Sequence, residues 1–407
     1  MTSRGPGLTD STAPRQVWLH AHAAAANFGD QLLVDAIREG VARQAGVRTT
    51  YLDACPGPAD QALDLSRLHE RRTRRAVLEA LSDSSAVLVG GGDVLGVGTA
   101  FLNLAVMAKI VGRPVAWFGV GGTLGSGRLG RLLQRRALEW AHAVVIRDQR
   151  SFDEVTGVVR HRRVWFAADP AFSLIRPPED RESTGPPEIG VALRGPERHD
   201  RMWDRQVMLR LAQVLGELKR QGYREVFLVL LTSEAAKRVG SPNIPGTFTS
   251  DDDVVDFVVR HGLLEGCEVV RFTGDTRPVI RRIQRLHLLV GMRLHALLVA
   301  GASGVPFIAL DYAPKVSQFA ARMASTAWQL GPEGVERIPA LVGQLEDVAV
   351  REHHRQALLR EAEGARREAE SALAVLKDLA RGGSPVRAVR RGIADATGML
   401  IANWARL

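Results

Sequence analysis

Short apolar runs alternate with helical patterns along most of the chain. Such runs, bounded by glycine or polar turns, are typical of strands buried on both faces, and helices between successive strands are typical of a parallel sheet. In the first half the pattern predicts strands at 17–19, 47–52, 86–89, 114–122, 143–146 and 164–167, with helices from about 30 to 41 and at 63–81, 103–111 and 129–142. The second half repeats it, with strands at 189–193, 225–230, 268–272, 288–291 and 306–311 and helices at 202–221, 253–261 and 276–286.

Two successive series of this kind in 407 residues exceed one ordinary core and predict an α/β protein with two domains. We expect two Rossmann-like, doubly wound domains that face a cleft, followed by C-terminal helices. The expected divisions are a disordered lead-in at 1–15, a first domain at 16–175, a Pro-rich linker at 176–188, a second domain at 189–349 and a helical extension at 350–407.

The chain is basic, with a formal net charge of +9, which favours anionic partners. Only 5% of the residues are aromatic and no nucleic-acid-binding module is recognisable, so nucleic acid is not an expected partner. Two cysteines, no signal peptide and no long apolar run predict a cytoplasmic protein. The amphipathic segment 386–407 has two readings: it docks on the body of the protein, or it makes a peripheral membrane contact.

The stretch 288–315 gathers cationic and protonatable side chains at the ends of buried strands. Arg293 and His295 are expected in the first turn of a helix, where free backbone N–H groups and the helix dipole favour an anion, and Lys315 follows the next strand. The pattern predicts a place that holds phosphate or carboxylate. The histidines have no metal-ligand spacing, so no metal and no cofactor is expected.

In the first half, polar residues and glycines follow the expected strands. Asn27 and Asp30 open the first helix, Gly91, Gly92 and Asp93 continue the run 86–89, and Arg147 follows 143–146 directly. Ligands of open α/β sheets bind at the carboxyl ends of strands, so these residues are candidates for a site. Asp30 has the alternative of capping its helix only.

Several motifs follow one another along the chain, namely Asn27-x-Gly29-Asp30, Gly90-Gly91-Gly92, Arg147-Asp148-x-x-Ser151, Asp169-Pro170-Ala171-Phe172, Met292-Arg293-Leu294-His295, Gly304-Val305-Pro306 and Asp311-Tyr312-x-x-Lys315. In their order and spacing the sequence resembles the polysaccharide pyruvyltransferase family between about residues 17 and 325. The resemblance implies two Rossmann-like domains arranged as in GT-B glycosyltransferases. It also implies transfer of a pyruvyl group from phosphoenolpyruvate to two hydroxyls of a sugar in a glycan or glycan precursor, giving a pyruvate ketal and phosphate.

The resemblance places the donor on the second domain and the acceptor on the first. It implies that the donor-binding residues are Arg147, His295 and Lys315, with Arg293 beside them. His295 is the expected acid, although it has the alternative of binding phosphate only. The acceptor-lining candidates are Asn27, Asp30, Gly91, Gly92 and Asp93, with Asp30 as the expected base.

Two other functions stay open at this point. One is a GT-B-type nucleotide-sugar glycosyltransferase, which needs a carboxylate of the second domain placed for the ribose hydroxyls. The other is a non-enzymatic basic protein that binds an anionic membrane surface through its final helix. The sequence does not identify the acceptor sugar, the ketal position or the oligomeric state.

Overall fold

A computed structural model describes residues 16–20, 27–45, 49–53, 63–64, 70–96, 99–125, 127–159, 163–179, 185–195, 203–238 and 248–380. The predicted lead-in 1–15, residues 180–184 of the predicted linker and the predicted final helix 386–407 lie outside these ranges. In the part of the chain that is described, no helix is long and apolar enough to cross a membrane.

The first domain is built on a parallel seven-stranded sheet with the order β3-β2-β1-β4-β5-β6-β7. Its strands are β1 (Gln16–His20), β2 (Thr49–Asp53), β3 (Leu63–Asp64), β4 (Ser84–Leu95), β5 (Val115–Gly122), β6 (Ala143–Ile146) and β7 (Val164–Phe166). Its helices are α1 (Phe28–Ala45), α2 (Arg71–Asp83), α3 (Thr99–Ile110), α4 (Arg128–Glu139) and α5 (Gln149–Val158), and the short 3-10 helix η3 (Pro170–Ser173) follows β7.

The second domain has a parallel six-stranded sheet with the order β10-β9-β8-β11-β12-β13. Its strands are β8 (Glu188–Ala192), β9 (Arg224–Val229), β10 (Glu268–Arg271), β11 (Leu288–Gly291), β12 (Phe307–Leu310) and β13 (Gln329–Leu330). Its helices are α6 (Arg205–Arg220), α7 (Ser233–Arg238), α8 (Asp251–His261), α9 (Thr276–Gln284), α10 (Leu294–Ala302), α11 (Pro314–Arg322) and α12 (Ile338–Glu346), with 3-10 turns η4 (Thr326–Trp328) and η5 (Pro332–Arg337).

Both sheets reverse their strand order at one point, between β1 and β4 in the first domain and between β8 and β11 in the second. Open α/β sheets bind ligands at such a reversal, outside the carboxyl ends of the strands. The predicted α/β class with parallel, doubly wound sheets is confirmed.

Two sequence-based boundaries are wrong. The helix expected at 63–81 begins at Arg71, because Leu63–Asp64 pair with β2 as a short edge strand. The glycines at 90–92 do not end their strand: β4 continues to Leu95, with a register shift against β5 after Gly92. Glycine is compatible with that irregular segment, since Gly91 and Gly92 have φ of 83° and 101°.

The two domains are joined by packing as well as by the chain. Phe28 of α1 makes an edge-to-face contact with Phe272 of the second domain, with ring centroids 5.6 Å apart. The Phe28 N–H donates to the Leu230 carbonyl at 3.0 Å, and the Thr276 hydroxyl donates to Asp35 at 2.8 Å. Helix α1 therefore belongs to the first sheet by sequence but packs into the apolar core of the second domain.

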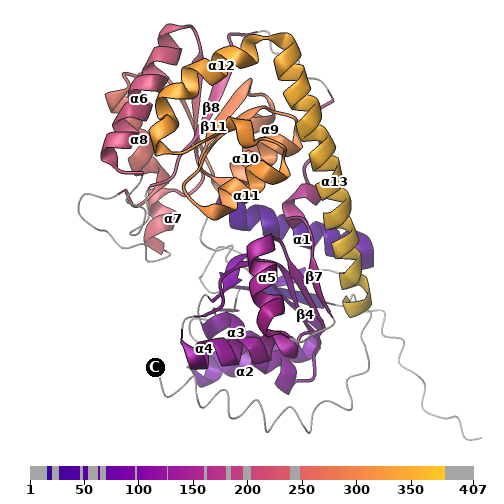
Figure 1. Ribbon diagram of the computed structural model, residues 1–407. Coiled ribbons are helices and arrows are strands. Elements are labelled where there is room, and N and C mark those ends of the chain that lie inside the picture. The colour runs from indigo at the N-terminus through magenta and orange to yellow at the C-terminus, as the bar shows by residue number, and fades with distance from the viewer. Residues whose placement is uncertain are drawn as a thin grey trace, which may run out of the picture.

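The long helix α13 (Val348–Ala380) runs along both domains, as Figure 1 shows on the right-hand side. Its Leu358 and Ala362 pack in the second-domain core, while Leu373 and Leu376 pack against Val34, Ile37 and Val41 of α1. The first part of the predicted helical extension is thus a strap that ties the second domain back onto the first.

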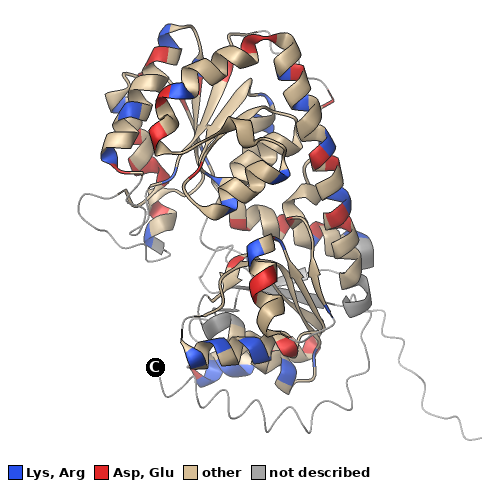
Figure 2. Cartoon of the chain, in the orientation of Figure 1, with Lys and Arg blue, Asp and Glu red and all other residues tan. Residues whose placement is uncertain are grey.

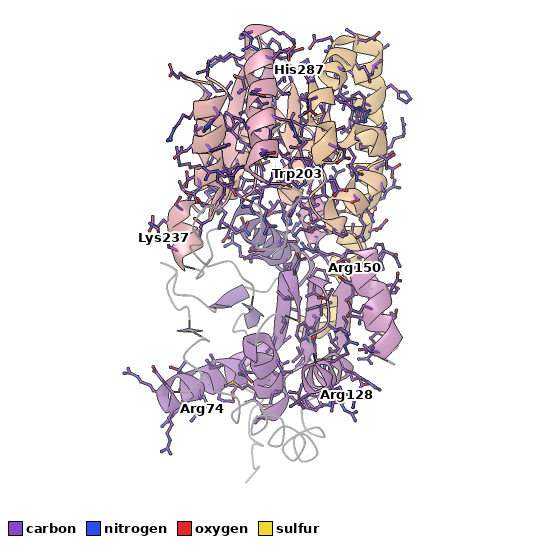
Figure 3. All side chains as sticks on the ribbon, turned by 60° about the vertical axis from the view of Figure 1, so that its left-hand side comes forward. Arg74, Arg128, Arg150, Trp203, Lys237 and His287 are labelled. Atoms are coloured by element: carbon purple, nitrogen blue, oxygen red, sulfur yellow. The ribbon has the colours of Figure 1, made fainter. Side chains whose placement is uncertain are left out.

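The positive charge of the first domain gathers at the end far from the second. Figure 2 shows rows of basic residues on α2 and α4 there, and Figure 3 places Arg74 and Arg128 at that end. These arginines do not reach the strand ends that face the second domain.

Candidate functional site

Arg293 lies where β11 passes into α10. It is the N-cap residue of that helix, with extended backbone angles, so its predicted place in the first turn is wrong by one position. Its Nε donates to Asp251 Oδ2 at 3.1 Å, and its Nη2 contacts Asp251 Oδ1. Asp251 Oδ2 also accepts the Leu230 and Leu231 N–H groups, each at 3.0 Å. Burial raises the pKa of Asp251. The neighbouring charge of Arg293 lowers it by less, so the net shift of the Asp251 pKa is upward. Arg293 is therefore held in one orientation by a buried carboxylate.

His295 lies in the first turn of α10, as predicted, and packs on α1 of the other domain. A Cβ added at Gly29 would lie 2.2 Å from His295 Nδ1, so only glycine leaves room for the ring. His295 Nε2 lies 3.5 Å from Arg147 Nη1 and 3.6 Å from Asp169 Oδ2. His295 Nε2 therefore faces both the Arg147 guanidinium and the Asp169 carboxylate. The guanidinium can donate to an unprotonated Nε2 and the carboxylate can accept from a protonated one, so the ring has an orienting partner in either state.

Arg147 follows β6 and is almost fully buried, with 7% of its side chain exposed. Its Nη1 donates to Asp169 Oδ2 at 2.8 Å and its Nη2 to Asp93 Oδ1 at 2.7 Å. Burial disfavours the charged guanidinium, but Asp93 and Asp169 outweigh this effect and raise the pKa of Arg147 above its usual value. Arg147 stays cationic in a place that excludes most water.

The two carboxylates beside Arg147 stay ionised. Burial favours the neutral form of Asp169, but the His295 ring and the Arg147 charge outweigh it and lower the pKa of Asp169 to about 2. Burial likewise opposes ionisation of Asp93, but Arg147 and Lys315 hold the pKa of Asp93 well below its usual range. Strongly shifted groups that cluster in a cavity are typical of functional sites.

Lys315, in the first turn of α11, reaches across to the first domain. Its Nζ lies 3.1 Å from Asp93 Oδ2 and 6.0 Å from the ring centroid of Tyr312. The Tyr312 hydroxyl accepts a hydrogen bond from Arg194 Nη1 at 2.9 Å. Burial raises the pKa of Tyr312, but Lys315, Arg194 and Arg293 lower it more, so the net shift is downward. The phenol lies in a strongly positive surrounding.

The α1 end of the site is formed by Asn27, Gly29 and Asp30. Asn27 Oδ1 accepts the Gly29 N–H at 3.0 Å, so Asn27 provides the capping contact that the sequence alternatively gave to Asp30. Asp30 lies in the first turn of α1. A Cβ at Gly92 would lie 3.1 Å from Asp30 Oδ1, which shows how closely α1 approaches β4.

These side chains surround one cavity of about 270 Å³ between the domains. The predicted site residues that line it are Asn27, Asp30, Asp93, Arg147, Arg293, His295 and Lys315. Gly91 and Gly92 are not among its lining residues; they lie in β4 just before Asp93. Among the described residues, no group of three His, Cys, Asp or Glu side chains is arranged to hold a metal ion.

The site also includes residues that the sequence analysis did not select, some on the cavity wall and some behind it. Arg194 follows β8 and Tyr312 follows β12, and both line the cavity. Asp169 and Asp251 are the buried partners of Arg147 and Arg293. Tyr312 and Asp169 stand within quoted motifs, so their motif positions were the signal that was available. Arg194 and Asp251 have no such signal.

Comparison with known proteins agrees with this geometry. The family model of polysaccharide pyruvyl transferases matches residues 27–314, which include the strand ends around the cavity. No curated protein matches the sequence.

Several solved structures share the arrangement of the two domains. A putative UDP-N-acetylglucosamine 2-epimerase from Listeria monocytogenes has a TM-score of 0.58 and 12% identity, over 90% of this chain and 96% of its own. The UDP-GlcNAc 2-epimerase from Neisseria meningitidis, bound to UDP-GlcNAc, has a TM-score of 0.53 and 10% identity. The match covers 90% of this chain and 100% of the epimerase chain.

A UDP-forming α,α-trehalose-phosphate synthase from Burkholderia vietnamiensis has a TM-score of 0.52 and 11% identity, over 93% and 99%. At these identities the likeness shows the fold alone, and the expected GT-B-like arrangement is confirmed. The family match covers most of the chain and both halves of the cavity. The chain belongs to the polysaccharide pyruvyl transferase family and is a transferase.

Proposed function

We propose that this transferase moves a pyruvyl group from phosphoenolpyruvate to two hydroxyls of a sugar, forming a pyruvate ketal and releasing phosphate. The observation that carries the proposal is the meeting of Arg147 of the first domain with His295 and Lys315 of the second at one cavity. Phosphoenolpyruvate carries a phosphate and a carboxylate close together, so its site needs several cations. Arg194 and Arg293 add two more to the same cavity.

The reaction balances with the groups present. One acceptor hydroxyl forms a bond to C2 of the donor while the methylene carbon C3 takes a proton and becomes a methyl group. The second hydroxyl then forms a bond to C2, and the bond from C2 to the phosphate oxygen breaks. Of the two hydroxyl protons released, one balances the proton gained at C3 and the other balances the phosphate that leaves.

His295 is our candidate for the acid that protonates C3, since histidine changes charge near neutral pH and the ring is held between Gly29 and the Arg147–Asp169 pair. In the alternative role it binds phosphate only. Asp30, in the first turn of α1, is the candidate base for an acceptor hydroxyl. The sugar would then lie at the α1 end of the cavity, near Asn27.

The alternative function is a GT-B-type nucleotide-sugar glycosyltransferase. The structural neighbours named above include an epimerase bound to UDP-GlcNAc and a UDP-forming synthase, but they support the fold only. A nucleotide-sugar site needs a carboxylate of the second domain for the ribose hydroxyls. Among the described residues of that domain that line the cavity there is none, because Asp251 is fully buried and is bonded to Arg293 and to backbone. This favours phosphoenolpyruvate.

The test is phosphate release from phosphoenolpyruvate with and without a mixture of glycan precursors. We expect release only when an acceptor is present, and loss of release in Arg147→Ala and in His295→Ala. Arg128→Ala is the matched control, because Arg128 lies at the far end of the first domain (Figure 3). An active Arg147→Ala/His295→Ala double variant would contradict the proposal. A thermal shift with UDP but none with phosphoenolpyruvate would favour the alternative.

A further inference from the structure

The Asp93 carboxylate occupies the space between two of the cations of the cavity. Asp93 Oδ1 lies 2.7 Å from Arg147 Nη2, and Asp93 Oδ2 lies 3.1 Å from Lys315 Nζ. Asp93 thus pairs one carboxylate oxygen with a cation of the first domain and the other oxygen with a cation of the second domain. Asp93 and Lys315 are 222 positions apart in the sequence. A carboxylate in this position fills the place that an anionic ligand of the same two cations would take.

The charges around Arg147 already balance. Asp93 and Asp169 are ionised, and they face one guanidinium and one ammonium group. Arg293, which also lines the cavity, forms an ion pair with the buried Asp251, and this pair is neutral as a unit. An anion that approaches this cluster therefore meets cations whose attraction is already used by carboxylates of the protein. Direct binding of an anion to both Arg147 and Lys315 therefore requires a carboxylate to leave these two partners.

Asp93 is the carboxylate that is able to leave. Its side chain is 46% exposed, whereas that of Asp169 is 10% exposed. Asp169 Oδ1 also accepts the Ala171 N–H at 2.9 Å and so caps η3, which anchors it. Asp93 follows directly on Gly92, whose φ is 101°, in the irregular last part of β4. Rotation of the Asp93 side chain into the cleft therefore breaks no helix-capping hydrogen bond such as the one that Asp169 makes with the Ala171 N–H.

We propose that the anionic donor displaces Asp93 from Arg147 and Lys315, so that Asp93 is an internal competitor that sets the donor affinity. This inference rests on the proposed function, since it takes phosphoenolpyruvate as the donor. The displaced carboxylate stays in the same cavity as Asn27 and Asp30, which is the part assigned to the acceptor. Donor binding therefore changes the surface that the sugar meets.

The test is calorimetric titration of phosphoenolpyruvate into the full-length wild type and Asp93→Asn, with Asp93→Ser as a second variant if the first does not fold. Loss of the competing carboxylate is expected to lower Kd at least tenfold. Asp153→Asn is the matched control, because it makes the same charge change at an exposed position on α5, where Asp153 accepts a hydrogen bond from the Gln149 amide. Its Kd is expected to stay within about twofold of the wild type.

A second titration separates displacement from a general effect of charge. In a Lys315→Ala background the gain from Asp93→Asn is expected to shrink at least threefold, because one of the two cations that Asp93 occupies is gone. An equal gain in both backgrounds, or a Kd for Asp93→Asn that equals or exceeds that of the wild type, would overturn the inference while leaving the donor in place. If neither the wild type nor any variant binds phosphoenolpyruvate, the proposed function is contradicted as well.

Discussion

Arg147 Nη1 and His295 Nε2 lie 3.5 Å apart, although the two residues are 148 positions apart and belong to different domains. Asp169 Oδ2 lies 2.8 Å from Arg147 Nη1 and 3.6 Å from His295 Nε2. The donor site that we propose exists only when the domains are held together, and α1 and α13 provide that contact. Changes that move either side chain by a small distance are expected to affect the reaction more than the fold.

Gly29→Ala tests the position of His295. The added Cβ would lie 2.2 Å from His295 Nδ1, so the ring must move away from Arg147 and Asp169. We expect phosphate release to fall at least tenfold while the far-UV circular dichroism is unchanged. Gly130→Ala is the control, since its Cβ would meet nothing within 4 Å and alanine favours the helix. Full activity of Gly29→Ala would show that the ring position is unimportant.

Arg147→Lys tests the need for a guanidinium. Arg147 bonds Asp93 and Asp169 through two separate nitrogens, whereas an ammonium group is a point charge that cannot reproduce this fork. We expect the Kd for phosphoenolpyruvate to rise about 10- to 100-fold, in keeping with a loss of about 1.5–3 kcal/mol for a hydrogen bond to a charged group. Arg150→Lys, at an exposed neighbouring position, should bind as the wild type does. Calorimetry of the three proteins decides this.

Tyr312→Phe tests the phenol of the cavity. The pKa of Tyr312 is lowered from 10.0, since Lys315, Arg194 and Arg293 outweigh the effect of burial. On rising pH the wild type therefore forms a phenolate in the donor site below pH 10, which repels an anionic donor. We expect donor affinity of the wild type to decline between neutral pH and pH 10, and Tyr312→Phe to lose much of this decline. Parallel declines in both proteins would exclude Tyr312 as its source.

His354 gives a prediction about stability. It is buried against Trp328, with ring centroids 4.9 Å apart, and burial lowers the pKa of His354 to about 4. The unfolded chain binds this proton near pH 6.5 and the folded protein does not, so stability is lost as pH falls from about 6.5 to 4. The loss from this residue is at most about 3 kcal/mol, from roughly 1.4 kcal/mol per pH unit.

The measurement for His354 is thermal unfolding at pH 7 and pH 4.5. Because phenylalanine can retain the stacking on Trp328 but cannot take up a proton, His354→Phe should lose less stability than the wild type over this interval. An equal loss in the two proteins would assign the acid sensitivity to other groups. At pH 7 the His354→Phe variant is expected to be less stable than the wild type, because the Ser325 hydroxyl loses its hydrogen-bond partner, His354 Nε2, which lies 3.1 Å away.

Much of the fold could be predicted from apolar periodicity, because buried parallel strands leave a clear mark in the sequence. The run 288–291 is a four-residue strand with every residue buried, as its composition indicates. The start of α2 was missed because Leu63–Asp64 pair with β2, a tertiary contact that helical periodicity does not record. The role of α13 as a strap between domains could not be read from its charged sequence.

The candidate site was predictable in part for the same reason. Residues that follow strands, such as Arg147 and His295, meet because the carboxyl ends of both sheets face one cavity. Their carboxylate partners are set by tertiary contacts between distant segments, and no local pattern records them. Asp251 stands 42 positions before Arg293, and its pairing depends on the start of α8 reaching the end of β9.

The most direct test of the account is a titration of phosphoenolpyruvate into the wild type and Lys315→Ala, with UDP as the competing ligand class. Lys315 lines the cavity and its side chain is 35% exposed, so its removal should leave the fold intact. We predict that the wild type binds phosphoenolpyruvate, that Lys315→Ala binds it at least tenfold more weakly, and that UDP gives no comparable heat. Binding of UDP together with no binding of phosphoenolpyruvate by the wild type would contradict the account.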